Sequence, residues 1–430
     1  MSFEFATAGR ILFGNGTLSQ AAPAAAQFGL RALVVTGRNT GRAKALLDAL
    51  KKEGVTCEIF PLAGEPTVND AKRAAAFECD VVIGFGGGSV IDLAKAAAAL
   101  MTNPGNPFDY LEVIGKGMPL INRPAPCIAI PTTAGTGAEV TKNSVLSSPE
   151  HRVKVSLRHP LMLPDLAIVD PECTLSAPPA VTAATGLDAL TQLLEAFISR
   201  KASPMTDGFC REGLPRVVRA LRRAVENGAD LKAREEMALG SLFSGLALAN
   251  AGLGAVHGFS GPVGGMFDAP HGMVCAALLP HTMKANLAAL RERVSENIVG
   301  QGCHSLRSLL RNSEAPLPLV ESLYPESLCT DTRSRIREAR PTKEDDPIHY
   351  RAIERLTEFA RMTGGSTAED GIKWIAGLCR DVQVPSLAAL GVAENDFPAL
   401  VGNAQRASSM KTNPVELTVD ELKQILCAAL

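Results

Sequence analysis

The sequence carries no marked excess of charge of either sign. Its 430 residues include 43 lysines and arginines against 45 aspartates and glutamates, which gives a formal net charge of −2, and the basic residues form no long run. Proteins that bind nucleic acid or an anionic membrane usually carry a strongly basic surface. The charge balance therefore gives no reason to expect nucleic acid or a membrane as a partner, and it favours a small molecule.

Paired cysteines and a secretory signal are also missing. The ten cysteines are scattered without a CxxC pair, in a chain too long to need disulfides for stability. The first residues, MSFEFATAGRILFGNG, lack the basic start, the apolar run and the cleavage site of a signal peptide. Both absences predict a reducing compartment and a cytoplasmic protein.

Long uninterrupted hydrophobic runs are scarce as well. Residues 241–267 contain no Asp, Glu, Lys or Arg, but Ser241, Asn250 and Pro262 interrupt their apolar character. This stretch therefore predicts a buried helix and not a membrane span. A chain of this length with 46% hydrophobic residues can bury substantial cores in two domains.

Strand and helix patterns alternate in the first part of the chain. The segment RALVVTG (31–37) is apolar and β-branched, KALLDALKKEG (44–54) has helical spacing, and DVVIGFGGG (80–88) returns to strand character. Strands separated by helical crossovers form parallel sheets that helices cover on both faces, with ligands at the carboxyl ends of the strands. The pattern predicts a Rossmann-like α/β domain with a parallel sheet.

Strand patterns disappear after about residue 178. Ala- and Leu-rich segments with helical periodicity follow, and the two prolines of SAPPA (176–180) mark a boundary because proline interrupts helices and strands. We predict an α/β domain over residues 1–178 and an all-α domain over 179–430. Residues 296–349 are rich in Ser, Arg, Pro and Glu and do not fit this pattern. They are interpreted as an atypical insert, either a surface insertion or an error in the gene model.

Four residues in the second part could hold a metal ion. Asp188 and Gln192 stand four residues apart on a predicted helix and therefore share one face. His257 and His271 flank a glycine-rich, almost uncharged segment. Carboxylate, amide and imidazole ligands suit a cation such as Fe²⁺ or Zn²⁺ and leave a position open for a substrate oxygen. A histidine on an apolar helix is more often a hydrogen-bonded core residue, so spacing alone leaves both interpretations open.

A glycine-rich turn follows the predicted strand at 80–88 and opens a helix. Gly86, Gly87 and Gly88 let backbone amides approach a pyrophosphate at the positive end of the helix, and Ser89 adds a hydroxyl. A tight turn also needs glycine, so the turn by itself does not decide between a structural turn and a phosphate site.

Four motifs occur in an order that resembles the iron-containing alcohol dehydrogenases: GGGSVIDLAK, PTTAGTGAEVT, the helix of Asp188, and the VHG and PHG pair. The resemblance covers residues 1 to about 295. It implies a dehydroquinate synthase-like fold, in which the α/β domain binds a dinucleotide and the helical domain holds the metal and the substrate. It also implies an NAD(P)-dependent alcohol dehydrogenase that interconverts a small alcohol and its aldehyde or ketone, commonly as a homodimer.

The resemblance assigns cofactor contacts in the first two motifs. Asp92 lies at the family spacing after the glycine turn, and the second motif forms a loop that lies against the dinucleotide in the family. The residues expected to bind the cofactor in these motifs are Gly86, Gly87, Gly88, Ser89, Asp92, Thr132, Thr133 and Thr136.

The resemblance also assigns metal ligands. The family uses an Asp, a His four residues later, and two further His residues. Asp188, His257 and His271 match three of these and are the expected catalytic residues, whereas Gln192 is a weaker ligand in place of the fourth. Gly261 replaces a histidine that the family often carries four residues after the first His of the pair, so a proton relay through it is missing. The expected metal is Fe²⁺, or Zn²⁺.

The altered ligand set leaves two alternatives open. One is a metal-independent enzyme that resembles the maleylacetate reductases. The other is a nucleotide-binding protein that has lost catalysis together with the histidine at position 192.

The choice of cofactor depends on the end of the strand at 31–37. Many NAD-dependent relatives place an acidic residue there, which binds the ribose hydroxyls and repels a 2′-phosphate. This chain has Gly37 followed by Arg38. Arg38 or Arg42 could bind a phosphate through charge-assisted hydrogen bonds, which predicts NADP(H) in preference to NAD(H). The alternative is that Arg38 is an ordinary solvated loop residue.

Overall fold

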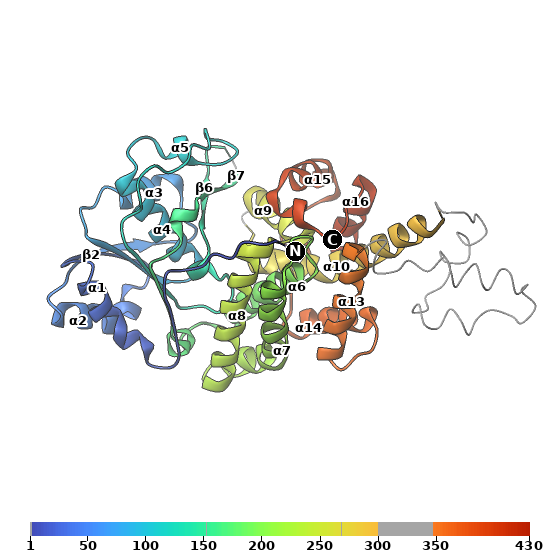
Figure 1. Ribbon diagram of the computed structural model, residues 1–430, viewed down its shortest axis with the longest axis horizontal. Coiled ribbons are helices and arrows are strands. Elements are labelled where there is room, and N and C mark those ends of the chain that lie inside the picture. The colour runs from blue at the N-terminus through green and yellow to red at the C-terminus, as the bar shows by residue number, and fades with distance from the viewer. Residues whose placement is uncertain (1, 152, 268, 300–346) are drawn as a thin grey trace, which may run out of the picture.

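The computed structural model describes residues 2–151, 153–267, 269–299 and 347–430. The segment interpreted as an atypical insert, about 296–349, lies outside the described residues except at its ends. One half of the molecule holds a sheet with its helices, and the other half is a bundle of helices (Figure 1).

Six strands form one parallel sheet, in the order β1-β8-β5-β4-β2-β3. Their bounds are β1 (Ile11–Phe13), β2 (Arg31–Gly37), β3 (Thr56–Leu62), β4 (Val81–Gly86), β5 (Cys127–Pro131) and β8 (Leu166–Val169). The central strands β4 and β5 are buried along their whole length because both faces of the sheet are covered. The predicted parallel sheet is confirmed.

Four helices cover the two faces of the sheet: α1 (Ala21–Ala26), α2 (Lys44–Lys52), α3 (Val68–Ala74) and α4 (Gly88–Thr102). Alternate residues of β2 point to opposite faces, as strand geometry requires. Val34 belongs to the hydrophobic cluster formed with α1 and α2, whereas Leu33 belongs to the cluster formed with α3 and α4. The sheet therefore separates two apolar layers.

A small antiparallel hairpin follows β5 and was not predicted. It consists of β6 (Asn143–Ser148) and β7 (Val153–Arg158), which pair with each other and not with the main sheet. The polar sequence of β6 gives little strand signal. The hairpin packs on α4, and β7 contacts helix α9 (Ala255–Phe267) of the other half.

The second half consists of helices, as predicted. Those that the structure describes are α6 (Pro179–Ile198), α7 (Pro204–Glu226), α8 (Leu231–Ala251), α9 (Ala255–Phe267), α10 (His271–Val299), α13 (Pro347–Met362), α14 (Ala368–Asp381), α15 (Phe397–Arg406) and α16 (Val419–Ala429). Helix α6 packs against α7, α8, α10 and α13, and every residue from Gly186 to Ile198 is buried. Any polar side chain on this part of α6 must find its partners inside the protein.

The uncharged stretch 241–267 differs from the single buried helix that its composition predicts. Helix α8 ends at Ala251 because Gly252 adopts a left-handed backbone with φ of 70°, a conformation that glycine adopts without strain. Helix α9 then leaves at 100° to α8. Helix α10 is apolar and long enough to cross a bilayer, but 72% of its apolar window is buried inside the protein, which fits a core helix.

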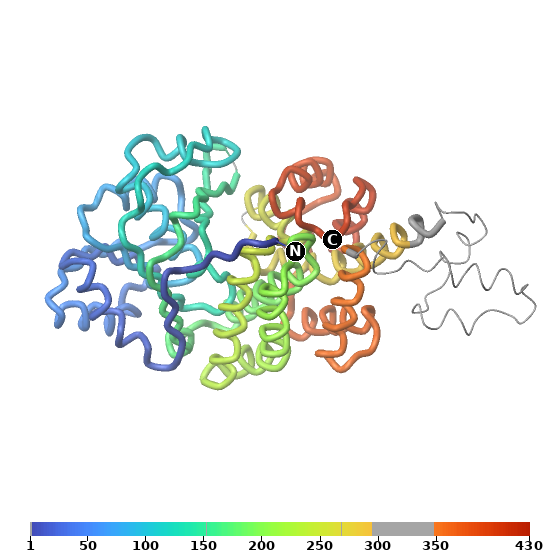
Figure 2. Tube along the Cα trace, in the orientation of Figure 1, coloured from blue at the N-terminus to red at the C-terminus, as the bar shows by residue number. Residues whose placement is uncertain are grey.

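The two halves meet at a close backbone contact between Gly137 and Gly245. Gly137 lies in the segment PTTAGTGAEVT (131–141) with φ of 62°, and a Cβ atom on Gly245 of α8 would lie 2.7 Å from its Cα. The N-terminal segment forms a second link, and Figure 2 shows it extending from the sheet to the helices. Its Ala6 exchanges two backbone hydrogen bonds with the side chain of Asn250.

The substitution Gly245→Ala tests this contact. The added methyl group would meet Gly137 and Val140 at 2.7 Å, and we expect the free energy of unfolding to fall by about 1–3 kcal/mol, the usual cost of overpacking. Urea denaturation measures the change. Gly261→Ala is the matched control, because Gly261 also lies in a helix but has no atom within 4 Å of the added Cβ. Equal stability of the two variants would contradict the expected clash.

Candidate active site

One face of α6 carries three buried polar side chains. Asp188, Gln192 and Glu195 are each no more than 3% exposed, and their spacing of four and then three residues places them on the same face of the helix. Buried carboxylates are costly unless charges or hydrogen bonds compensate them. The partners of these side chains therefore define the centre of the helical half.

His257 lies between the two carboxylates. It stands in the first turn of α9, where its Nδ1 lies 2.7 Å from Glu195 Oε2 and its Nε2 lies 3.2 Å from Asp188 Oδ1. The other oxygen of Glu195 accepts the backbone N–H of Val256 at 2.7 Å. Glu195 thus holds the imidazole by Nδ1 and directs Nε2 toward Asp188, as carboxylates often do behind metal-binding histidines.

His271 is the first residue of α10 and approaches Asp188 from another side. A Cβ atom on the next residue, Gly272, would lie 2.1 Å from the carbonyl oxygen of Ala184, so glycine is needed for α10 to start this close to α6. His271 Nε2 lies 3.7 Å from Asp188 Oδ1. The structure therefore brings together three of the predicted residues, Asp188, His257 and His271.

Cys275 belongs to the same group but was missed in the sequence. It lies one turn after His271 on α10 and is fully buried, with its Sγ 3.8 Å from His257 Nε2 and 3.7 Å from His271 Nε2. The potential ligand atoms of Asp188, His257, His271 and Cys275 all lie within 4.8 Å of one another. The spacing of four residues between His271 and Cys275 could have revealed it.

Two loops at the carboxyl ends of β4 and β5 lie side by side. Gly86 ends β4, Gly87 precedes α4, and no side chain caps the first amides of that helix. The second loop approaches this turn: Thr132 N–H donates to the carbonyl of Gly86 at 2.8 Å, and a Cβ atom on Gly88 would lie 2.7 Å from the side chain of Thr136. The helix amides remain available to an anionic ligand.

The other predicted residues of these loops occupy the same edge of the sheet. Ser89 and Thr133 are partly buried, and Thr133 lies 3.4 Å from a Cβ atom built on Gly87. Asp92 lies one turn further into α4, where it pairs with Lys95 at 3.1 Å and accepts the backbone N–H of Val145 at 3.0 Å. These contacts give Asp92 a structural role, and its contact with a cofactor stays a prediction.

Comparison of the chain with known protein families shows to which family it belongs. The iron-containing alcohol dehydrogenase family matches residues 8–171, and the C-terminal family of Fe-containing alcohol dehydrogenases matches residues 182–324. The chain belongs to the iron-containing alcohol dehydrogenase family. The resemblance to this family that the sequence motifs indicated is confirmed.

Individual relatives of this family resemble the chain over most of its length. Long-chain-alcohol dehydrogenase 1 of Geobacillus thermodenitrificans is 40% identical over 319 residues, which cover 72% of this chain and 80% of that protein. NAD-dependent methanol dehydrogenase of Bacillus methanolicus is 34% identical over 306 residues, 67% of this chain and 79% of that protein. The crystal structure of 1,3-propanediol oxidoreductase superposes with a TM-score of 0.79 at 30% identity and covers 100% of both chains.

Gln192 is the main departure from the family pattern, and its surroundings differ from those of a ligand. Its Nε2 donates to Asp188 Oδ2 at 3.0 Å, and its Oε1 accepts from the hydroxyl of Ser244 at 2.8 Å. The amide oxygen is therefore engaged away from the two histidines. Ser244 Oγ also lies 3.4 Å from the carbonyl of Gly135. Gln192 thus connects Asp188, through Ser244, to the loop at Gly135, and its role as a metal ligand stays a prediction.

Gly261, the second departure, leaves open space one turn after His257. Among the described residues, no atom lies within 4 Å of a Cβ atom built there. In contrast to the buried His257, whose side chain is 7% exposed, the side chain of His271 is 41% exposed. His271 therefore connects this group of residues to solvent.

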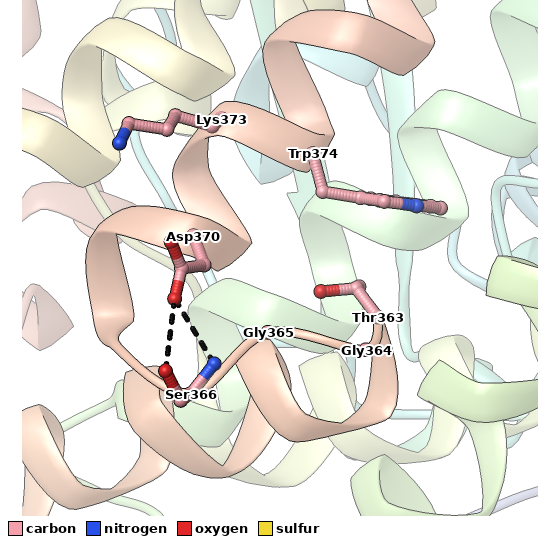
Figure 3. A pocket seen from close by; sticks show the side chains of 7 residues that line it. All are labelled: Thr363, Gly364, Gly365, Ser366, Asp370, Lys373 and Trp374. Atoms are coloured by element: carbon pink, nitrogen blue, oxygen red, sulfur yellow. Dashed lines mark hydrogen bonds between the residues drawn. The ribbon is translucent and has the colours of Figure 1, made fainter.

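A separate surface pocket of about 590 Å³ lies between α13 and α14 (Figure 3). It is lined by Thr363, Gly364, Gly365, Ser366, Asp370, Lys373 and Trp374. The Asp370 carboxylate accepts hydrogen bonds from the backbone and hydroxyl of Ser366 and from the backbone of Thr367, which lowers its pKa to about 2. Asp370 serves to cap α14, so this pocket offers no free catalytic carboxylate.

The charged side chains around Asp188 shift one another's pKa values. Burial raises the pKa of Asp188, but the positive charges of His271 and His257 outweigh burial and lower it overall. Burial opposes the charge on His271, but Cys275 and Asp188 outweigh it and raise the pKa of His271 to about 9. Burial also raises the pKa of Cys275, but His271 and His257 lower it overall. Without metal, the imidazoles and the two acidic groups therefore stabilise each other's charged forms.

The titration of His271 in metal-free protein tests this electrostatic arrangement. We expect its ring proton signals to titrate near pH 9 in an NMR experiment, since the neighbouring anions stabilise the imidazolium form. The substitution Cys275→Ala removes one of these anions and should move the pKa of His271 down toward 6.5.

His281 is the internal control, because burial and Lys284 lower its pKa below the usual 6.5. A midpoint for His271 at or below that of His281 would contradict the arrangement.

Proposed function

We propose that this protein is an NAD(P)-dependent alcohol dehydrogenase that interconverts a small alcohol and its aldehyde or ketone by hydride transfer, assisted by a divalent metal. The observation that carries the proposal is the convergence of Asp188, His257 and His271 next to the dinucleotide loops. Helix α6 places them there: Thr185 contacts the loop at Gly135, and the adjacent Ala184 contacts the start of α10 at Gly272.

The chemistry of the donor atoms fits Fe²⁺ or Zn²⁺. A carboxylate oxygen, two imidazole nitrogens and a thiol lie within 4.8 Å of one another, and borderline cations accept this mixture of donors. When bound, the metal would act as a Lewis acid that stabilises negative charge on the substrate oxygen.

The chain's own residues supply the remaining functions. Glu195 accepts a hydrogen bond from Nδ1–H of His257, which keeps Nε2 directed toward Asp188. The glycine turn leaves the first amides of α4 for the pyrophosphate of the cofactor. Because Gly261 carries no side chain that could donate a proton, we propose that the product oxygen is protonated by solvent on the exposed side of His271.

The family membership favours this dehydrogenase over the two alternatives. A metal-independent enzyme of the maleylacetate reductase kind would not need the two histidines to converge on Asp188. A non-catalytic nucleotide-binding protein would likewise give no reason for Glu195 to orient His257. A cytoplasmic location and a homodimer accompany the proposal as expectations from the sequence.

Metal analysis tests the proposed function. Protein purified under anaerobic conditions should contain metal near one equivalent per chain, measured by mass spectrometry, and chelation should abolish aldehyde reduction until metal is restored. His257→Ala should lower metal affinity and turnover by at least about 100-fold, because even outer-shell changes cost 10–100-fold. Full activity of chelated, metal-free protein would refute the metal-assisted reaction and would support the metal-independent alternative.

Within this proposal, we infer that NADP(H) is preferred over NAD(H). Gly37 at the end of β2 has no atom within 4 Å of a built Cβ, which leaves room beside the ribose. Arg38 and Arg42 are exposed, and within the described residues neither is paired with a carboxylate. A relative named as NAD-dependent shows that the family also includes the other preference.

The substitution Arg38→Ala tests the cofactor preference. Loss of a charge-assisted hydrogen bond costs about 1.5–3 kcal/mol, so kcat/KM with NADPH should fall by roughly 10–100-fold. The value with NADH should stay within a factor of about two, and it serves as the control within the same variant. A wild-type enzyme that strongly prefers NADH would overturn the inference without affecting the dehydrogenase itself.

A further inference from the structure

We propose that Cys275 is the fourth protein ligand of the metal, in place of the imidazole that the family carries at position 192, and that its thiolate makes the site favour Zn²⁺. The inference rests on the proposed function, since it concerns the same metal. The change from His to Gln at 192 would then move one ligand from α6 to α10 without reducing the number of strong donors.

Three distances between donor atoms are close to those of a tetrahedral zinc site, whereas the 3.7 Å between His271 Nε2 and Asp188 Oδ1 is somewhat longer than such a site needs. Zn–S bonds of about 2.3 Å and Zn–N bonds of about 2.0–2.1 Å at tetrahedral angles place sulfur and nitrogen donors about 3.6 Å apart. Cys275 Sγ lies 3.7 Å from His271 Nε2 and 3.8 Å from His257 Nε2. The same bond lengths place nitrogen and oxygen about 3.3 Å apart, and His257 Nε2 lies 3.2 Å from Asp188 Oδ1.

Gln192 is poorly arranged to be the fourth ligand itself. Its oxygen accepts a hydrogen bond from Ser244, and its NH₂ group donates to the Asp188 carboxylate. A cation at the centre of the group would face the donor side of the amide, which carries partial positive charge. Gln192 is therefore better suited to orient the Asp188 carboxylate through a hydrogen bond, without contacting the metal.

Cys275 differs from the other buried cysteines in its surroundings. Cys210 lies in the apolar core of the helical half, and Cys127 lies in the apolar layer of the sheet. Cys379 contacts the carbonyl of Ala276 on α10. Only Cys275, among the cysteines in the described ranges, has a sulfur that faces two imidazoles and a carboxylate.

A thiolate ligand changes the preference of the site among metals. Thiolates are soft donors that Zn²⁺ binds strongly, and Cys, His and Asp are all zinc ligands in proteins. Four protein donors would leave a substrate oxygen to bind as a fifth ligand, a coordination number that catalytic zinc can reach. The expected preference for Zn²⁺ over Fe²⁺ is therefore a property of this chain's own ligand set.

Spectroscopy of the full-length protein tests the ligand directly. Metal-free protein loaded with Co²⁺ under anaerobic conditions should show a near-ultraviolet thiolate-to-cobalt charge-transfer band, and X-ray absorption of the zinc-loaded protein should show one sulfur neighbour at about 2.3 Å. Both measurements use the wild-type chain and do not depend on the folding of a variant.

Variants then separate ligation from structure. Cys275→Ser should lose the charge-transfer band and bind Zn²⁺ at least about 100-fold more weakly, as measured by competition with a chromophoric chelator. Cys379→Ser is the matched control, because it changes a buried cysteine beside the same helix and should keep both properties. Adding Gln192→His to Cys275→Ser should restore zinc affinity without restoring the band.

The outcomes distinguish this inference from the proposed function. If the wild-type protein binds Co²⁺ and Zn²⁺ without a sulfur neighbour, and Cys275→Ser binds zinc as tightly, Cys275 is not a ligand, whereas the metal-assisted dehydrogenase stands. If the wild-type protein binds neither metal, both the inference and the metal-assisted reaction fail.

Discussion

The buried carboxylates of α6 are the constraint around which the helical half is organised. Asp188 and Glu195 lie in a part of the helix where every residue is buried, and two unpaired negative charges there would cost several kcal/mol. His257 compensates both at once, with one nitrogen near each carboxylate. This requirement draws the beginning of α9 onto α6, and the lack of a side chain at Gly254 makes the approach to Glu195 possible.

Much of the architecture could be predicted because its signals are local. The apolar strands and the amphipathic helices have periods of two and 3.6 residues, and β2, β4 and α6 lie where these periods place them. The convergence of Asp188, His257 and His271 also agrees with the sequence motifs. The end of α8 was not predicted, although Gly252 directly after the helix is a local stop signal, because the uncharged stretch was interpreted from its composition alone.

Two features of the site were not predicted from the sequence, the position of Cys275 and the orientation of Gln192. Cysteine in the apolar segment GMVCAALL looks like a core residue, so Cys275 was overlooked although it stands four residues after His271. The orientation of Gln192 depends on Ser244, which is 52 residues away in the chain. Motif residues can also serve the fold: buried Lys95 pairs with Asp92 and donates to the carbonyl of Ala138, which fixes α4 against the second cofactor loop.

The backbone contact between Gly137 and Gly245 leaves no room for the two halves to slide past each other. The contact of β7 with α9 and the hydrogen bonds between Ala6 and Asn250 join the same halves at further points. The loop of Thr132 and Thr136 is therefore anchored to the helices that carry the histidines, and the fold itself fixes the spacing between the two sets of residues.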